Sequence, residues 1–216
     1  MLNNDSFPKG GFTTYLRQQY SPVPESEEER LMEAIIELLD KSQGPFDSTV
    51  SFLEQAAKMI HRRFEFSRIA IGLKDRTDDL FRYKVFIGFT GSAEQAHRKM
   101  AYTQKDMLDD VKFPALKLSR TTEFLRESQA EGERELYNRP SELGKERRDK
   151  KEFKEGDYFD IFMYGDKHEM IGWFELSRTK NDLLPPRRTI KWLELIAKIV
   201  ARVIWDREYS FRNRPR

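Results

Sequence analysis

The sequence predicts an α/β (α+β) protein in which a central antiparallel sheet is flanked by helices. One observation is a pair of apolar runs, residues 158–164 and 170–176, joined by a short polar turn in the pattern of a β-hairpin. The other is apolar residues at helical spacing in 31–39, 50–64 and 190–204. Both runs of the hairpin are apolar at nearly every position. We therefore expect its strands to be covered on both faces, by helices or a ligand on at least one side.

Composition excludes several classes of protein. The length of 216 residues favours one large domain with extensions, and 38% hydrophobic against 35% charged residues indicates a lean core that a disordered chain would lack. The absence of cysteine excludes disulfides, a thiolate nucleophile, Cys-ligated zinc or iron–sulfur sites and a covalently attached bilin. A net charge of +2 is a small basic excess and argues against nucleic acid as a partner.

The sequence also bears on location. No apolar run approaches the roughly 18–20 residues that a membrane span needs, and the first residues lack the apolar core of a signal peptide. We therefore expect a soluble, cytoplasmic protein that does not bind membranes.

The N-terminal part is predicted to be an arm followed by a helix. Residues 1–26 are interrupted by prolines and glycines, and their apolar side chains either dock on a partner or are exposed by chance: Phe7, Phe12, Tyr15, Leu16 and Tyr20. Ser26 is a candidate N-cap, and Glu29 completes a capping box for a helix over 27–40, with a linker to residue 44.

A second helix is predicted from residue 47 or 48 to about 64, followed by a hairpin of strands 67–73 and 80–90. We then expect short helices over 92–100 and 104–111 and an extended stretch over 112–118 before another helix. That helix begins at Ser119 or Thr121 and ends near Ser128.

The last third of the chain combines a charged insertion with the hairpin and a long helix. Residues 130–155 are predicted to be a solvated, mobile insertion. The alternative is a basic docking site over 145–151, although interleaved acidic residues weaken the positive field that such a site needs. A helix over 188–209 follows the hairpin, and residues 210–216 form a basic tail.

The order of elements over 45–209 resembles a GAF domain, a sensing and dimerising module of the PAS-like fold class. The most telling part is the hairpin with Gly165-Asp166 in its turn and Ile171-Gly172 opening its second strand, followed by the segment 184–205 that contains the last helix. The chain lacks the Asn-Lys…Phe…Asp-Glu motif of the cyclic-nucleotide-binding members. It also lacks the cysteines of the methionine-sulfoxide-reductase and bilin-binding members.

No catalytic constellation is present, so we expect a protein that is not an enzyme. His61, His97 and His168 are scattered over different elements, without neighbours at metal-ligand spacing on a clear element. Residues 88–92 place glycines and hydroxyls before a helix, which favours a turn and cap over an anion site. Nothing indicates a metal, haem or covalent bilin, and the identity of any cofactor stays open.

The resemblance implies a ligand pocket between the sheet and residues 91–128. The residues that would line it are Phe86, Phe89, Tyr102, Arg120, Thr122, Tyr158, Asp160 and Phe162. Packing of helices on the sheet explains the aromatic members equally well.

The resemblance also implies a homodimer formed by the two terminal helices, whose apolar stripes are wider than one sheet needs. The candidate interface residues are Leu31, Ile35, Leu38, Trp192, Leu195, Ile199 and Val203.

We therefore expect a non-catalytic regulatory domain that binds a small ligand, dimerises, or engages a signalling partner protein. One alternative is a ligand-free interaction module whose pocket is filled by its own aromatic side chains. A further alternative, a nucleic-acid-associated factor, would use the basic pairs 62–63, 98–99 and 187–188 and the stretch 145–151.

Overall fold

The computed structural model describes residues 11–19, 26–43, 48–127 and 134–209. The chain divides into two compact units, Met1–Glu37 and Leu38–Arg216. The first unit holds helix α1 (Gly11–Gln19), which the sequence analysis did not predict within the arm, and most of α2 (Glu27–Gln43). Ser26 caps α2 as expected, because its Oγ accepts a hydrogen bond from the Glu29 amide at 3.1 Å.

The apolar side chains expected in the arm can be followed only in part. Phe12, Tyr15 and Leu16 are exposed on α1, whereas Phe7 and Tyr20 lie outside the described residues. A docking role for this segment stays a prediction.

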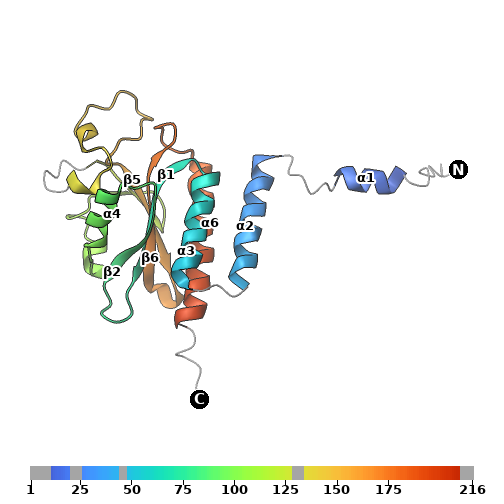
Figure 1. Ribbon diagram of the computed structural model, residues 1–216, viewed down its shortest axis with the longest axis horizontal. Helices are drawn as coiled ribbons and strands as arrows, with labels where there is room; N and C mark the ends of the chain where they lie inside the picture. The colour runs from blue at the N-terminus through green and yellow to red at the C-terminus, as the bar shows by residue number, and fades with distance from the viewer. Residues whose placement is uncertain (1–10, 20–25, 44–47, 128–133, 210–216) are drawn as a thin grey trace, which may run out of the picture. The chain divides into compact units, whose positions relative to one another are not determined.

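The second unit is built on a six-stranded sheet with the order β2-β1-β6-β5-β4-β3, in which all neighbouring strands are antiparallel. Its strands are β1 (Phe66–Lys74), β2 (Phe81–Ile87), β3 (Ala115–Lys117), β4 (Thr122–Leu125), β5 (Tyr158–Tyr164) and β6 (Met170–Thr179). Both predicted hairpins, β1–β2 and β5–β6, are confirmed, and so is the predicted fold class (Figure 1).

Helices cover the two faces of the sheet differently. Helices α3 (Thr49–Arg63) and α6 (Arg187–Ile204) pack on one face, which we call the helix face. On the other side α4 (Gly91–Arg98) packs on β2, followed by the short α5 (Gln104–Met107). In Figure 1 α3 and α6 lie together on one side of the sheet and α4 lies on the other. Side chains alternate between faces along each strand, so each strand contributes to both layers.

The connections follow from local chemistry. Ser48 caps α3 by accepting a hydrogen bond from the Ser51 amide, and Thr90, rather than Ser92, caps α4. The turn between β2 and α4 requires Gly88, which has φ +77° and whose added Cβ would lie 1.9 Å from the Ser67 carbonyl oxygen. The segment 88–92 is therefore a turn and a cap.

The helix predicted from Ser119 or Thr121 to Ser128 is wrong. Residues Thr122–Leu125 form β4, which pairs with β5 on one side and β3 on the other. The hydroxyl that suggested a helix cap instead closes a turn, because Ser119 Oγ accepts from the amides of Thr121 and Thr122. Pairing with an apolar neighbouring strand decides the conformation here.

The charged segment after β4 is tied to the sheet by buried ion pairs. Glu155 is buried and accepts two hydrogen bonds from the guanidinium of Arg68 at 2.5 and 2.9 Å, and Arg139 donates to it as well. Phe153 is buried too, with only 2% of its surface exposed. The expectation of a solvated insertion over 130–155 therefore fails for these residues, because a buried arginine on β1 requires a carboxylate partner.

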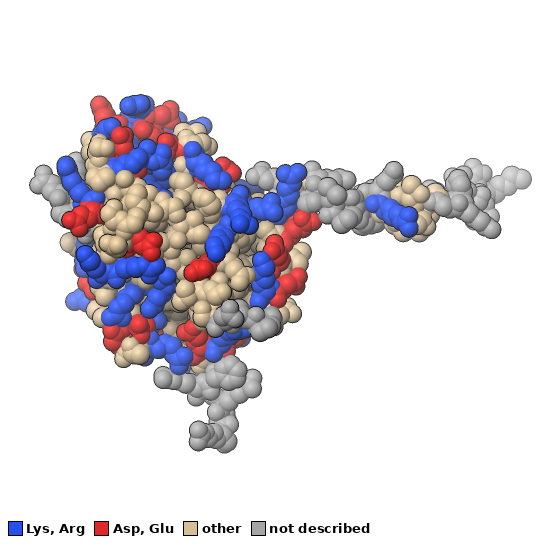
Figure 2. Space-filling model, in the orientation of Figure 1, with Lys and Arg blue, Asp and Glu red and all other residues tan. Residues whose placement is uncertain are grey.

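Charges of both signs cover the rest of the surface. Figure 2 shows Lys and Arg side chains interspersed with Asp and Glu over the face drawn, without a broad field of one sign. Among the described residues, no helix is both long and apolar enough to cross a membrane.

Candidate functional site

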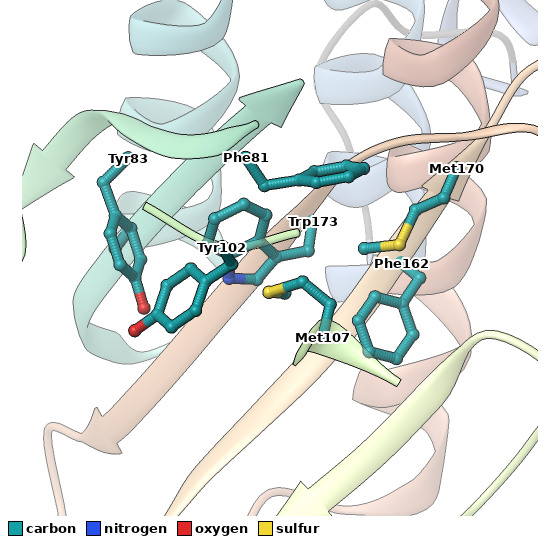
Figure 3. Close-up of a cluster of buried hydrophobic side chains, with 8 residues drawn as sticks. Phe81, Tyr83, Tyr102, Met107, Phe162, Met170 and Trp173 are labelled. Atoms are coloured by element: carbon teal, nitrogen blue, oxygen red, sulfur yellow. The ribbon is translucent and has the colours of Figure 1, made fainter. Parts of the chain in front are cut away.

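Aromatic side chains gather on the face of the sheet opposite the helix face. Their cluster, drawn in Figure 3, consists of Ala70, Phe81, Tyr83, Tyr102, Met107, Phe162, Met170 and Trp173. The ring of Tyr83 lies edge-on to Trp173 with 4.9 Å between centroids, and Tyr102 approaches the same indole at 6.4 Å. In Figure 3 both tyrosine rings lie on the same side of Trp173 and their hydroxyls point the same way. We call this side of the sheet the site face.

A glycine lets the indole lie flat on the sheet. Gly72 on β1 pairs with Trp173 on β6, and a Cβ added to Gly72 would come within 2.0 Å of the indole ring. Any larger residue would therefore displace Trp173 and the tyrosines that pack against it.

Two small hollows open beside this aromatic wall, with volumes of about 50 Å³ and about 30 Å³. They share the lining residues Tyr83, Tyr102, Phe113, Tyr158 and Glu175. A water molecule needs roughly 10–15 Å³ of such space. The hollows therefore hold a few waters or one small polar group. We call the two together the site cavity.

Three carboxylates form a row across the floor of this cavity. Asp160 on β5 pairs directly with Glu175 on β6 and, on its other side, with Glu123 on β4. Side chains of directly paired residues point to the same face of a sheet, with Cβ atoms roughly 4.5–5.5 Å apart. The sheet thus places three acidic groups side by side on the site face, where like charges destabilise one another.

Glu175 and Asp160 differ in their hydrogen bonds. Glu175 is buried and accepts a hydrogen bond from the Tyr83 hydroxyl at 2.5 Å. The ring of His97 from α4 lies nearby, with Nε2 at 4.0 Å from a Glu175 oxygen, while its Nδ1 donates to the Ala93 carbonyl at 2.8 Å. Asp160 is only 8% exposed, and its Oδ1 has no hydrogen-bond partner among the described residues.

The environment favours the neutral forms of Asp160, Tyr83 and Tyr158. Burial, with the added repulsion of Glu175 and Glu123, raises the pKa of Asp160 well above its ordinary value. Burial and the nearby Glu175 carboxylate also raise the pKa of Tyr83, and burial together with Asp160 raises the pKa of Tyr158. The cavity therefore contains hydroxyl groups and a carboxyl group that lacks a counter-charge.

Comparison with known proteins identifies the fold. No family model and no curated protein matches the chain. Among solved structures, the GAF domain of a phosphoenolpyruvate-protein phosphotransferase from Coxiella burnetii is similar, with a TM-score of 0.56, 9% identity and coverage of 87% of this chain and 99% of that one. The chain has the GAF fold.

Two further solved structures share this fold. One is the GAF domain of a protein described as a sensor histidine kinase from Pseudomonas syringae pv. tomato, with a TM-score of 0.53, 10% identity and coverage of 92% of this chain and 96% of that one. The other is a segment of a methyl-accepting chemotaxis protein, with a TM-score of 0.50, 13% identity and coverage of 81% and 97%. At such identities the likeness extends to the fold alone.

Most of the predicted pocket residues lie on the site face of this GAF fold. Tyr102, Tyr158 and Asp160 line the cavity, and Phe89 lines its larger hollow. The remaining two support the wall, because Phe86 packs edge-on against Phe89 and His97, and Phe162 pairs with Trp173 in the aromatic cluster.

Arg120 and Thr122 do not belong to this cavity. Thr122 is fully buried on the helix face, where its hydroxyl donates to Glu194 of α6 at 2.7 Å. Arg120 is exposed at a wider groove of about 800 Å³ between the β4–β5 part of the sheet and α6, beside Lys191 and Lys198. Thr122 faces the helices because side chains alternate between the two faces along β4, and its neighbour Glu123 points to the site face.

Sequence reasoning missed several lining residues. They are Arg68, Tyr83, His97, Phe113, Glu123, Trp173 and Glu175. A signal for one of them existed, since Glu175 is an isolated charge in an otherwise apolar strand, as is Asp160. Among the described residues, no group of three or more His, Asp or Glu side chains is placed to hold a metal ion.

The predicted dimer residues divide between the two helices. On α2, Leu31, Ile35 and Leu38 have 6%, 7% and 3% of their surface exposed. On α6, Leu195 is 42% exposed, and Trp192, Ile199 and Val203 are half-buried. The predicted interface, like dimerisation itself, stays a prediction.

Proposed function

We propose that this GAF-fold chain is a non-catalytic sensory or regulatory domain that binds a small ligand in the site cavity. The observation that supports it most is Asp160, a buried carboxyl in the cavity wall whose Oδ1 accepts no hydrogen bond from any of the described residues. Buried polar groups are nearly always paired, so an unpaired one calls for a partner such as a water, an ion or a ligand. The sensor kinase and chemotaxis proteins that share the fold support the same role.

The strands of the cavity give a route from ligand to output. Asp160 and Glu175 point into the cavity, while their neighbours along the chain, Ile161 and Phe174, lie on the helix face. Helix α6 packs on both β5 and β6. A ligand that fits one spacing of these strands better than another would shift the packing of α6, provided that its affinity differs between the two arrangements.

The ligand-free interaction module stays as a second candidate because the cavity is small. Aromatic side chains occupy most of the space on the site face, and the two hollows measure only about 50 and 30 Å³. In that case the exposed part of α6 around Leu195 would serve a partner protein or a second copy of the chain.

Native mass spectrometry and a thermal-shift screen test the proposal. The full chain is measured under gentle and then denaturing conditions, and its melting temperature is recorded across a library of small metabolites. We expect a released adduct, or at least one compound that raises the melting temperature in proportion to its concentration. No adduct and no shift across the library would contradict ligand binding and favour the interaction module.

A further inference from the structure

We propose that the ligand of the site cavity is a small protonated amine, held between the carboxylates of Asp160 and Glu175 and the aromatic wall of Tyr83, Tyr102 and Trp173. This inference rests on the proposed ligand-binding function and names the chemical class of the ligand. Three observations support it: the row of acids, the aromatic rings, and the unpaired polar atoms of the two hollows.

The acids require a positive charge that the chain does not supply. Glu123, Asp160 and Glu175 follow one another across three adjacent strands, and like charges placed directly opposite destabilise a sheet. Among the described residues no Lys or Arg forms an ion pair with Asp160 or Glu175, and the ring of His97 lies 4.0 Å from Glu175. An ammonium group would offset one negative charge of the row and donate to the free Oδ1 of Asp160.

The aromatic residues offer the other half of an ammonium site. Rings of Tyr83, Tyr102 and Trp173 meet edge to face, at centroid distances of 4.9 to 6.5 Å, beside Asp160 in the smaller hollow. Aromatic walls attract cations through the negative face of each ring. The chain already uses this attraction nearby, because the ammonium of Lys112 lies 5.8 Å from the centre of the Tyr102 ring.

The larger hollow limits the size and chemistry of the rest of the ligand. It continues from the shared tyrosines toward Arg68, whose Nε is buried and has no hydrogen-bond partner among the described residues. An oxygen acceptor a few atoms from the amine would therefore match the second unpaired group. The volumes of about 30 and 50 Å³ restrict the ligand to a few heavy atoms unless the wall moves.

Binding of a cation to Asp160 should release a proton. Its pKa is raised by burial and by Glu175 and Glu123, so the empty site keeps this carboxyl protonated at a pH where an exposed aspartate is ionised. An ammonium ligand favours the ionised form. Affinity should therefore rise as the pH approaches the raised pKa. The other titratable or charged groups that face the site are Arg68, Tyr83, His97, Tyr102, Glu123, Tyr137, Glu155, Asp157, Tyr158 and Glu175.

The test compares matched probes on the full chain. Ethanolamine and 3-aminopropanol are titrated beside their N-acetyl derivatives, which lack the charge, and beside acetate and propionate, which reverse it. We expect the amines alone to raise the melting temperature. Calorimetry in two buffers of different ionisation enthalpy should show the release of up to one proton per amine bound.

Asp160→Asn is the decisive variant, because it keeps the shape of the side chain and removes the charge. We expect it to lose at least tenfold in amine affinity, whereas Glu54→Gln, on the exposed surface of α3, leaves the affinity unchanged. If an N-acetyl compound or a carboxylate binds instead, and binding depends on Asp160, the amine inference is overturned and the sensory function stands. If none of these probes binds, the amine inference is overturned, and native mass spectrometry with the metabolite library decides the proposed function separately.

Discussion

The two faces of the sheet are built from alternate residues of the same strands, yet they differ in what they bury. On the helix face, Ile71, Phe174 and Leu176 pack under α3 and α6, and each has at most 1% of its surface exposed. On the site face, the next residues along are Gly72, Glu175 and Ser177, beside tyrosines and hollows. One face is optimised for stability, while the other accepts buried charge and empty space, which is typical of a binding site.

The largest effect should come from truncating the helix face. Leu53 of α3 is fully buried, so Leu53→Ala is expected to lower the free energy of unfolding by about 2–5 kcal/mol. Denaturant titration measures this change. The fraction that stays folded should bind an amine with unchanged affinity, and a cost below about 1 kcal/mol would mean that the helix face is not the main core.

On the site face a substitution should instead raise the free energy of unfolding. Asp160→Asn is expected to stabilise the empty protein at neutral pH, because the amide cannot acquire the buried negative charge that the neighbouring acids repel. The folded-state pKa of Asp160 is raised, so the wild type should lose stability as pH rises above the unfolded value near 4. The difference between the two proteins should therefore vanish in acid, and unfolding curves at several pH values would show it. Destabilisation by the variant at pH 7 would contradict this account.

A polar group on the helix face should affect stability alone. Thr122→Val removes the hydroxyl that donates to Glu194, which keeps its contacts with Ser119 and Lys191. We expect a loss of about 1 kcal/mol in stability and no change in amine affinity. Calorimetric titration of the variant tests this, and a loss of binding would place Thr122 in the site after all.

The sequence predicted the sheet better than the site. The hairpins could be recognised because Phe, Ile, Val and Trp dominate their strands and polar turns separate them. The pairing of Asp160 with Glu175 could not be read so directly, because a bulge between Met163 and Tyr164 shifts the register of the hairpin. Counting residues from the turn would therefore not have placed Asp160 opposite Glu175.

Two other features were beyond local reasoning. Strand β4 was taken for a helix because hydroxyls at Ser119 and Thr121 suit a cap, and this error assigned Thr122 to the wrong face. The ion pair of Arg68 with Glu155 joins residues 87 positions apart, and no periodicity in either segment indicates it. Tertiary pairing decided both cases.

The ionisation of Asp160 tests the central claim most directly. Carbon-13 NMR of the side-chain carboxyl groups, recorded against pH in the free protein and with ethanolamine, follows this residue alone once Asp160→Asn has assigned its signal. We predict a pKa well above the ordinary range in the free protein and a marked fall when the amine binds. An ordinary pKa in the free protein, or one that the amine leaves unchanged, would contradict a cavity in which this carboxyl waits for a cation.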